Sequence, residues 1–471
     1  MNARKRHLHH PPVLLALLTV AALGVGCKET YQKRVGGFMA SYRSGQFEQA
    51  AVLATATADA KQKDPAAILW RLEQGTALRT AGDYEASNAA FAMAEAKMDA
   101  ERAKGGIAAT AEVATLVVTA DARPYLGTDY DRIMTNTYQA LNNLELGEMD
   151  NAAAQLIRAY DRQKEAVIEN AKRIEKAEKE AKDKGVDTQR ASGDPKLQHQ
   201  LDENFPDIDK WKVYANYVNP YAEFLQGLYF TMGGEDGSDR ERGLLSFQRV
   251  AGMAPDNTQV SVDLALAEAI AQGNPPPALT YVIFETGTAP RRESVRIDLP
   301  LFVATRVDYV GVAFPKLNFN DNFASQLVVT AGGEAVPTQL LCDMDGVIYT
   351  EFKNRLPEEV TRALISAGIK SGGAYAASEA TRSDAVANAA VRIGMSLYNF
   401  ATNEADTRTW HTLPKQVQYA RLPTPEDRTL TLTASGGATQ TVTVAPGTVN
   451  VVVVRSTSAT APLKVSQFRL R

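Results

Sequence analysis

The stretch Gly75–Ala94, GTALRTAGDYEASNAAFAMA, decides how the first half of the chain is read. Two small residues, Gly75 and Gly82, and two aromatic residues, Tyr84 and Phe91, stand at the spacing of two short helices joined by a tight turn. Small residues let two antiparallel helices approach closely, and aromatic rings fill the space between them. The stretch therefore predicts a helical hairpin with its turn at Gly82.

The same pattern recurs through the first half of the chain. Helical periodicity follows turn glycines at Gly45 and Gly147, and a further unit begins at Gly227 and resumes at Gly243. These units match the tetratricopeptide repeat in a degenerate form. We therefore expect residues 27–273 to form a tetratricopeptide-like α-solenoid, with a plain helical bundle as the alternative. Solenoids of this type usually present a concave face to a peptide or a partner protein.

Two polar stretches lie within this helical region. Lys164–Lys184 is dense in alternating charge, with opposite charges four residues apart, as in Glu169 and Arg173. This arrangement favours a solvated helix over a basic binding patch, and Gly185 is placed to end it. Residues 187–205 are mostly polar, which predicts a loop.

The second half of the chain is rich in β-branched residues. Asn274 and the three prolines after it make a stiff segment, so we place a linker at 274–278. Short apolar runs bounded by turn residues predict a β-sandwich-like domain over 279–471, which makes the fold class α+β multidomain. A helical insertion is expected at about 346–402, with its second helix at 383–400. The predicted strands are 279–285, 295–298, 307–313, 326–330, 429–433, 440–444 and 449–454.

The N-terminus carries the pattern of a bacterial export signal. Basic residues at 4–6 precede the apolar stretch Val13–Gly26, which is too short to span a bilayer and ends in small residues. Cys27 follows directly, as in a lipoprotein signal. We therefore expect residues 1–26 to be a lipoprotein signal peptide and Cys27 to carry the lipid (palmitate) anchor. A plain secretory signal with an incidental cysteine is the alternative.

The residue after Cys27 and the overall charge bear on location and partners. Lys28 stands where an aspartate often signals retention in the inner membrane, so we expect the outer membrane, facing the periplasm. Removal of residues 1–26 takes away three basic residues and no acidic one, so the formal net charge moves from −4 to −7. This balance argues against a nucleic-acid binder that relies on a basic surface.

Side chains suited to catalysis are scarce in the chain after the signal. His199 and His411 are its only histidines, and Cys342 lies in an apolar run where a buried structural thiol is expected. Zinc, nucleotide-binding and catalytic-triad signatures are absent, so we expect no cofactor, no metal and no enzymatic activity. A glycosidase built on two carboxylates has no fixed spacing, and nothing in the sequence favours one.

The segment Leu340–Val347, LLCDMDGV, resembles the nucleophile motif of haloacid-dehalogenase-like phosphatases. In that family the first aspartate, here Asp343, attacks phosphorus, and the second, here Asp345, acts as general acid and base. The chemistry also needs a later lysine and an acidic pair for Mg²⁺, and the later aspartates lack the arrangement of that family. We therefore favour a strand that ends in a polar turn, with Asp345 or a neighbour capping the next helix. A phosphatase is the least favoured alternative.

Five further motifs follow one another along the chain. They are Tyr125–Arg162, Asn219–Gly227, Phe284–Pro290, Ala313–Pro315 and Asp406–Pro414. In this order they resemble a family of Gram-negative tetratricopeptide-like outer-membrane lipoproteins, over nearly all of the mature chain. The family has no established catalytic residues, so none is carried over. Some members are encoded near lipoproteins that activate penicillin-binding proteins, so the resemblance implies a role in envelope assembly.

These observations together predict a non-enzymatic, lipid-anchored periplasmic scaffold. Its partners would be envelope proteins, bound through the helical repeats, and the membrane, reached through the N-terminal lipid. The alternative is a carbohydrate- or peptidoglycan-binding envelope lipoprotein. In that case aromatic residues of the β-rich part, such as Trp410, would be exposed on one face.

Overall fold

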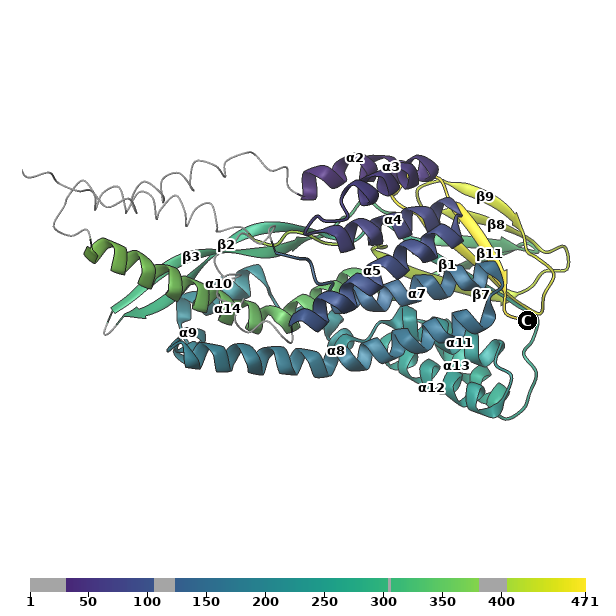
Figure 1. The fold of residues 1–471 in the computed structure, drawn as a ribbon. Coiled ribbons are helices and arrows are strands. Elements are labelled where there is room, and N and C mark those ends of the chain that lie inside the picture. The colour runs from purple at the N-terminus through teal and green to yellow at the C-terminus, as the bar shows by residue number, and fades with distance from the viewer. Residues whose placement is uncertain (1–30, 106–122, 304–305, 381–404) are drawn as a thin grey trace, which may run out of the picture.

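The computed structural model describes residues 31–105, 123–303, 306–380 and 405–471. Over these residues the chain is mixed α+β (Figure 1), with helices in its N-terminal part and several sheets in its C-terminal part. No helix in these ranges is both long enough and apolar enough to cross a lipid bilayer.

Helical hairpins follow one another along the N-terminal part. Their helices are α2 (Tyr31–Arg43) with α3 (Phe47–Ala60), α4 (Ala67–Ala81) with α5 (Tyr84–Gly105), α7 (Asp129–Leu146) with α8 (Met149–Asp183), and α11 (Pro220–Met232) with α12 (Gly237–Met253). Next, α13 (Thr258–Ala271) packs against α12. The first three turns lie at the predicted glycines Gly45, Gly82 and Gly147, with φ of 82°, 99° and 77°. Glycine adopts this left-handed conformation without steric penalty.

The small and aromatic residues of the hairpins pack as the sequence predicts. Gly75 in α4 faces Phe91 in α5, and a Cβ atom at Gly75 would lie 2.5 Å from the Phe91 ring. Gly227 in α11 faces Phe247 in α12 in the same way, at 3.2 Å. Both rings are fully buried. Each glycine therefore leaves the space that its partner ring fills.

The predicted loop at 187–205 is wrong, because this segment is largely helical. It contains α9 (Thr188–Ser192) and α10 (Pro195–Asn204). The side chains of Asp187 and Asp194 cap these helices by accepting hydrogen bonds from backbone N–H groups, each at 2.9 Å. Capping aspartates and a proline in the first turn are helix-start signals that outweigh the polar composition.

The strands of the C-terminal part form three sheets within the described residues. The five-stranded sheet has the order β11-β10-β1-β7-β6, the four-stranded sheet the order β5-β4-β8-β9, and β2 and β3 form a two-stranded ribbon. The strands are β1 (Leu279–Thr286), β2 (Arg291–Val303), β3 (Arg306–Asn318), β4 (Leu327–Ala331), β5 (Glu334–Pro337), β6 (Gln339–Asp343), β7 (Gln416–Pro423), β8 (Thr429–Ala434), β9 (Thr439–Thr443), β10 (Val449–Ser456) and β11 (Lys464–Arg469). All predicted strands are confirmed, whereas β5, β7 and β11 were not predicted.

The five-stranded sheet is covered on both faces. Val282 and Phe284 of β1 pack against Leu430 and Leu432 of β8, so the four-stranded sheet covers one face. The helices cover the other face. The sheets and the helices thus stack as three layers.

A continuous core joins the helices to the five-stranded sheet. Tyr281 of β1 and Tyr419 of β7 lie in one apolar cluster with Phe224 of α11. The hydroxyl groups of the two tyrosines both donate hydrogen bonds to the buried Asp263 of α13, at 2.9 and 2.8 Å. The residues on the two sides of the expected linker at 274–278 therefore share a core.

An elongated arm extends beyond the five-stranded and four-stranded sheets (Figure 1). It consists of the outer half of α8, of α14 (Met344–Ala380) and of the β2–β3 ribbon. As predicted, α8 runs through the charged stretch Lys164–Lys184 as one helix. The expected insertion at 346–402 corresponds in its first part to α14, and its second helix, at 383–400, lies outside the described residues. The arm has an apolar cluster of its own, which includes Ile297, Leu299, Phe314, Phe352, Leu356 and Leu364.

Candidate functional site

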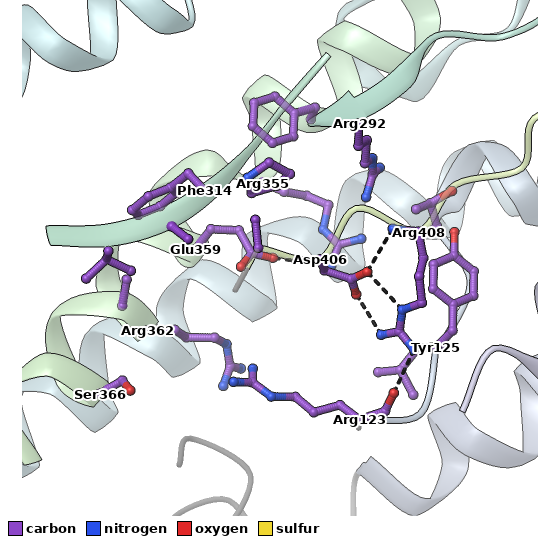
Figure 2. A pocket seen from close by; sticks show the side chains of 18 of the residues that line it. Arg123, Tyr125, Arg292, Phe314, Arg355, Glu359, Arg362, Ser366, Asp406 and Arg408 are labelled. Atoms are coloured by element: carbon purple, nitrogen blue, oxygen red, sulfur yellow. Dashed lines mark hydrogen bonds and ion pairs between the residues drawn. The ribbon is translucent and has the colours of Figure 1, made fainter. Parts of the chain in front are cut away.

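A cavity of about 370 Å³ lies where the arm joins the rest of the chain (Figure 2). Its walls come from residues 123–128 before α7, from β2, β3 and α14, and from residues 405–408 before β7. Five arginines and three carboxylates line it, which are Arg123, Arg292, Arg355, Arg362, Arg408, Glu351, Glu359 and Asp406. We call this cavity the arginine pocket.

Glu351 fixes α14 against the N-terminus of α7. Its two carboxylate oxygens accept hydrogen bonds from the backbone N–H groups of Asp129, at 2.8 Å, and Tyr130, at 2.7 Å. Burial, and then the charge of Asp129, raises the pKa of Glu351 to about 7. A helix N-terminus favours negative charge, so the carboxylate of Glu351 stabilises the first turn of α7.

Asp406 and Arg408 also line the pocket and form a bidentate ion pair. Nε and Nη2 of Arg408 donate to the two carboxylate oxygens of Asp406, at 2.8 and 2.7 Å. Nη1 of Arg408 donates to the carbonyl oxygen of Arg123, at 2.8 Å, and so holds the preceding loop. Burial opposes ionisation of Asp406, but the contacts with Arg408 outweigh it and hold the pKa of Asp406 below its usual value. This carboxylate is therefore already neutralised.

The arginines of α14 have acidic neighbours on their own helix. Nε of Arg362 donates to Glu358 at 2.9 Å, and Arg355 lies 3.8 Å from Glu359. Both pairs are spaced four residues apart, as expected on one helix face. The carboxylates of α14 thus compensate the arginines of α14.

Arg292 enters the pocket from β2. Figure 2 shows its side chain directed toward the Asp406–Arg408 pair. Its Nε atom is buried and has no hydrogen-bond partner among the described residues. A guanidinium group is always charged in proteins, and a buried donor without an acceptor is destabilising. The pocket is therefore suited to an anionic ligand at Arg292.

The wall formed by β3 and part of α14 is apolar. It includes Val312, Phe314, Pro315 and Ala363, and Leu126 stands at the pocket with 48% of its surface exposed. A ligand in this cavity would therefore meet charged groups on one side and carbon on the other. Such mixed walls are usual for small-molecule sites.

The first turn of α2 is tied to the wall of the pocket. Nε2 of Gln32 donates a hydrogen bond to the carbonyl oxygen of Thr407 at 2.7 Å. Thr407 lies between the two pocket residues Asp406 and Arg408. The start of the described chain and the arginine pocket are therefore neighbours.

The two aspartates of the phosphatase-like segment do not line the arginine pocket. Oδ2 of Asp343 accepts a hydrogen bond from Nε1 of Trp211 at 2.8 Å, and its backbone N–H donates to the hydroxyl of Tyr214 at 3.0 Å. Asp345 forms an ion pair with Lys415, and burial raises the pKa of Asp345 to about 7. Both side chains thus make structural contacts.

The segment around these aspartates is a strand followed directly by a helix. The expected strand is confirmed as β6, but α14 begins at Met344, so there is no polar turn and Asp345 lies inside the first helical turn. A Cβ atom at Gly346 would lie 2.4 Å from the Trp211 ring, which explains the glycine as a packing requirement. In the part of the chain that the structure describes, no group of three or more His, Cys, Asp or Glu side chains is placed to hold a metal ion.

Trp410 and His411 belong to the segment that leads into β7, and they contact the helix α4. Glu73, which is fully buried, accepts hydrogen bonds from the backbone N–H groups of His411, at 2.7 Å, and Thr412, at 3.1 Å. Trp410 is 0% exposed, and its Nε1 donates to Thr76 at 3.0 Å. Trp410 therefore does not have the exposure that the carbohydrate-binding alternative would require of it.

The remaining residues singled out in the sequence are widely separated. Cys342 is buried as predicted, and burial raises the pKa of its thiol. His199 is exposed on α10. Cys27, the predicted site of lipidation, lies outside the described residues.

Sequence reasoning missed the arginine pocket. Phe314, Asp406 and Arg408 fall within two of the five motifs that carry the family resemblance, and this was the one available signal. The other arginines stand on elements far apart in the sequence. Their convergence depends on long-range packing, which no local spacing records.

Comparisons with protein-family models, with curated proteins and with solved structures found no match.

Proposed function

We propose that the protein is a non-enzymatic, lipid-anchored scaffold on the periplasmic side of the outer membrane, where it binds envelope proteins. One observation carries the proposal. Tyr31 is 1% exposed and donates a hydrogen bond to the buried Glu73 at 3.2 Å. The predicted anchor, Cys27, is four residues earlier, and four residues span at most about 14 Å. A lipid on Cys27 would therefore hold the folded body directly against the bilayer.

The helical hairpins support the scaffold part of the proposal. We interpret them as degenerate tetratricopeptide repeats, because glycine and phenylalanine pack between their helices at Gly75–Phe91 and Gly227–Phe247. The five-stranded sheet covers one face of these helices, so a partner must bind elsewhere.

A shallow cavity between α8 and α12 offers such a surface. Ile157, 36% exposed, and Leu245, 44% exposed, line it together with Tyr160 and Arg249. Apolar side chains edged by charged ones are typical of protein interfaces. We therefore place the binding of envelope proteins at this surface, which we call the α8–α12 groove.

Membrane fractionation tests the anchor. The wild-type protein should sediment with outer membranes and dissolve only in detergent. The Cys27→Ser variant should lose this behaviour, whereas Cys342→Ser, which removes the buried thiol, should keep it. Equal sedimentation of wild type and Cys27→Ser would contradict the proposal.

Site-specific photocrosslinking in cells tests the groove. A photoreactive residue at Leu245 should capture one defined envelope protein, and the variant Ile157→Glu should abolish that capture. The control position is Val52, which is 64% exposed on α3. Capture that is equal at Val52, or that yields only copies of this chain, would contradict a scaffold role for the groove.

The two alternatives are not proposed. In the phosphatase-like segment, Oδ2 of Asp343 accepts a hydrogen bond from Trp211 and Oδ2 of Asp345 pairs with Lys415, while Oδ1 of each is buried without a partner among the described residues. The carbohydrate-binding alternative needs exposed aromatic residues, and Trp410, its named example, is buried.

A further inference from the structure

A scaffold role leaves the arginine pocket unexplained. Of its three carboxylates, Glu351 caps α7, Asp406 is paired with Arg408, and Glu359 faces Arg355 along α14. The pocket thus contains two more arginines than carboxylates. We propose that the arginine pocket binds a phosphate-bearing ligand, with Arg292 as its principal anion-binding residue.

The geometry of Arg292 favours a phosphate group. Nε of this residue is buried without a partner among the described residues, so its N–H group can donate a hydrogen bond to a ligand. A guanidinium group presents donors in a fixed plane and binds phosphate oxygens in pairs. A phosphate group also has further oxygens, which can reach the guanidinium of Arg355 on the facing helix. Figure 2 shows both side chains directed toward the space beside Asp406.

Crowding of like charges supports the same assignment. Burial, and also the neighbouring Arg362 and Arg408, lowers the pKa of Arg123 against the opposing effect of Glu359 and Asp406. An anion bound among these guanidinium groups would reduce their repulsion.

The framework around Arg292 is rigid enough to define a site. β2 and β3 pair without interruption from Arg291 opposite Asn318 to Val303 opposite Arg306. Phe314 of β3, 3% exposed, anchors the ribbon in the apolar cluster of the arm. Binding groups on paired strands are held more precisely than groups on loops.

The ligand should also have an apolar part. The cavity of about 370 Å³ is within the range of about 300–1,000 Å³ that is usual for small-molecule sites, and it exceeds what an inorganic phosphate ion fills. Val312, Phe314 and Pro315 line the side next to the arginines. These features fit the phosphorylated headgroup of a lipid with the start of its acyl chains.

The position of the pocket indicates where such a group would come from. Gln32, which is bonded to the pocket wall at Thr407, is five residues from Cys27, and five residues span at most about 18 Å. A lipid headgroup of the bilayer is therefore the expected source, and a soluble phosphorylated compound is the other. Only the choice of source rests on the proposed anchoring, because the pocket itself is formed without it.

Isothermal titration calorimetry on the full-length chain in a non-ionic detergent tests the proposal. The probes are dihexanoyl phosphatidic acid, inorganic phosphate and dihexanoylglycerol, which has the same tails without phosphate. We expect one equivalent of phosphatidic acid to bind, and dihexanoylglycerol not to bind. If inorganic phosphate binds at least about tenfold more weakly than phosphatidic acid, the ligand is a lipid headgroup. If the two bind with equal affinity, the ligand is a soluble phosphorylated compound. Absence of binding by both phosphate probes overturns the proposal.

Substitutions on β2 locate the site. Arg292→Gln should weaken binding by at least about tenfold, and Arg292→Lys, which keeps the charge but not the paired donors, should fall between it and the wild type. The control Arg291→Gln removes a positive charge from the adjacent, exposed residue and should bind normally. Unchanged affinity in Arg292→Gln overturns the assignment.

Thermal unfolding separates loss of binding from loss of folding. Nε of Arg292 is buried without a hydrogen-bond partner among the described residues, and its charge is attracted by Asp406. Loss of the unpartnered donor offsets loss of this attraction, so Arg292→Gln should melt close to the wild-type temperature. Weaker binding together with a lower melting temperature in both Arg292→Gln and Arg292→Lys would overturn the assignment in favour of a structural role. The assay is done in detergent, so its outcome does not depend on acylation of Cys27.

Discussion

Replacement of Glu73 by alanine should strongly destabilise the protein. This fully buried carboxylate accepts four hydrogen bonds from Tyr31, from the backbone of His411 and from the backbone and hydroxyl of Thr412. Nδ1 of His411 makes a fifth contact with it at 3.2 Å. Glu73 thereby joins α2 and α4 to the segment that leads into β7. In Glu73→Ala the two backbone N–H groups of His411 and Thr412 lose their acceptor inside the protein.

The expected loss follows from these two groups. A buried N–H without an acceptor costs about 2 kcal/mol, whereas the hydroxyl groups of Tyr31 and Thr412 can turn toward other acceptors. We therefore expect Glu73→Ala to lower the free energy of unfolding by about 4 kcal/mol. Glu73→Gln keeps one oxygen but presents an NH₂ group to Thr412. It should lower the free energy of unfolding by about half as much as Glu73→Ala.

Urea unfolding followed by tryptophan fluorescence measures this effect, because Trp410 adjoins the network. The matched control is Glu175→Ala on the exposed side of α8, which should change the free energy of unfolding by less than about 0.5 kcal/mol. A loss below about 1 kcal/mol in Glu73→Ala, or a loss equal to that of Glu175→Ala, would refute the reasoning.

Three further predictions concern the pH dependence, the helical hairpins and the shared core. Burial raises the pKa of Glu351 from 4.5 to about 7, so the folded protein keeps a proton that the unfolded chain loses, and this group makes stability fall as the pH rises between these values. Glu351→Gln should reduce the difference between urea titrations at pH 5 and pH 8 by up to about 3 kcal/mol, and an unchanged difference contradicts the assignment. Gly75→Ala should lower the free energy of unfolding by about 1–3 kcal/mol, because the added Cβ would clash with Phe91. Gly36→Ala, whose Cβ would meet open space in α2, should raise the stability slightly. Equal shifts in melting temperature for the two variants would refute the packing argument. Residues 31–273 expressed alone should exchange their core amide hydrogens rapidly, because the sheet that covers their apolar face is missing, and native-like protection would show that the shared core is dispensable.

Local features of the fold could be predicted because their causes are local. Gly45, Gly82 and Gly147 end helices in a conformation that suits glycine, and each stands at a predicted turn. Strands with clear β-branched runs were found for the same reason. The helices α9 and α10 were predictable as well, since their capping aspartates are visible in the sequence.

Features that depend on distant partners could not be predicted. β7 was missed because it contains Gln418, a polar residue that is buried in a central strand and accepts a hydrogen bond from Thr338 at 2.7 Å. The parallel pairing of β1 with β10 joins residues that are far apart in sequence. The arginine pocket has the same character, because Arg292 and Arg355 are brought together by the packing of the ribbon against α14.

The intact mass of the protein extracted from outer membranes tests the central claim most directly. The claim is that a lipid on Cys27 holds the folded body, with its arginine pocket, against the bilayer. The account predicts a chain that begins at Cys27 and carries the added mass of a lipid on that residue. A chain that begins elsewhere, or that begins at Cys27 without added mass, would contradict the account.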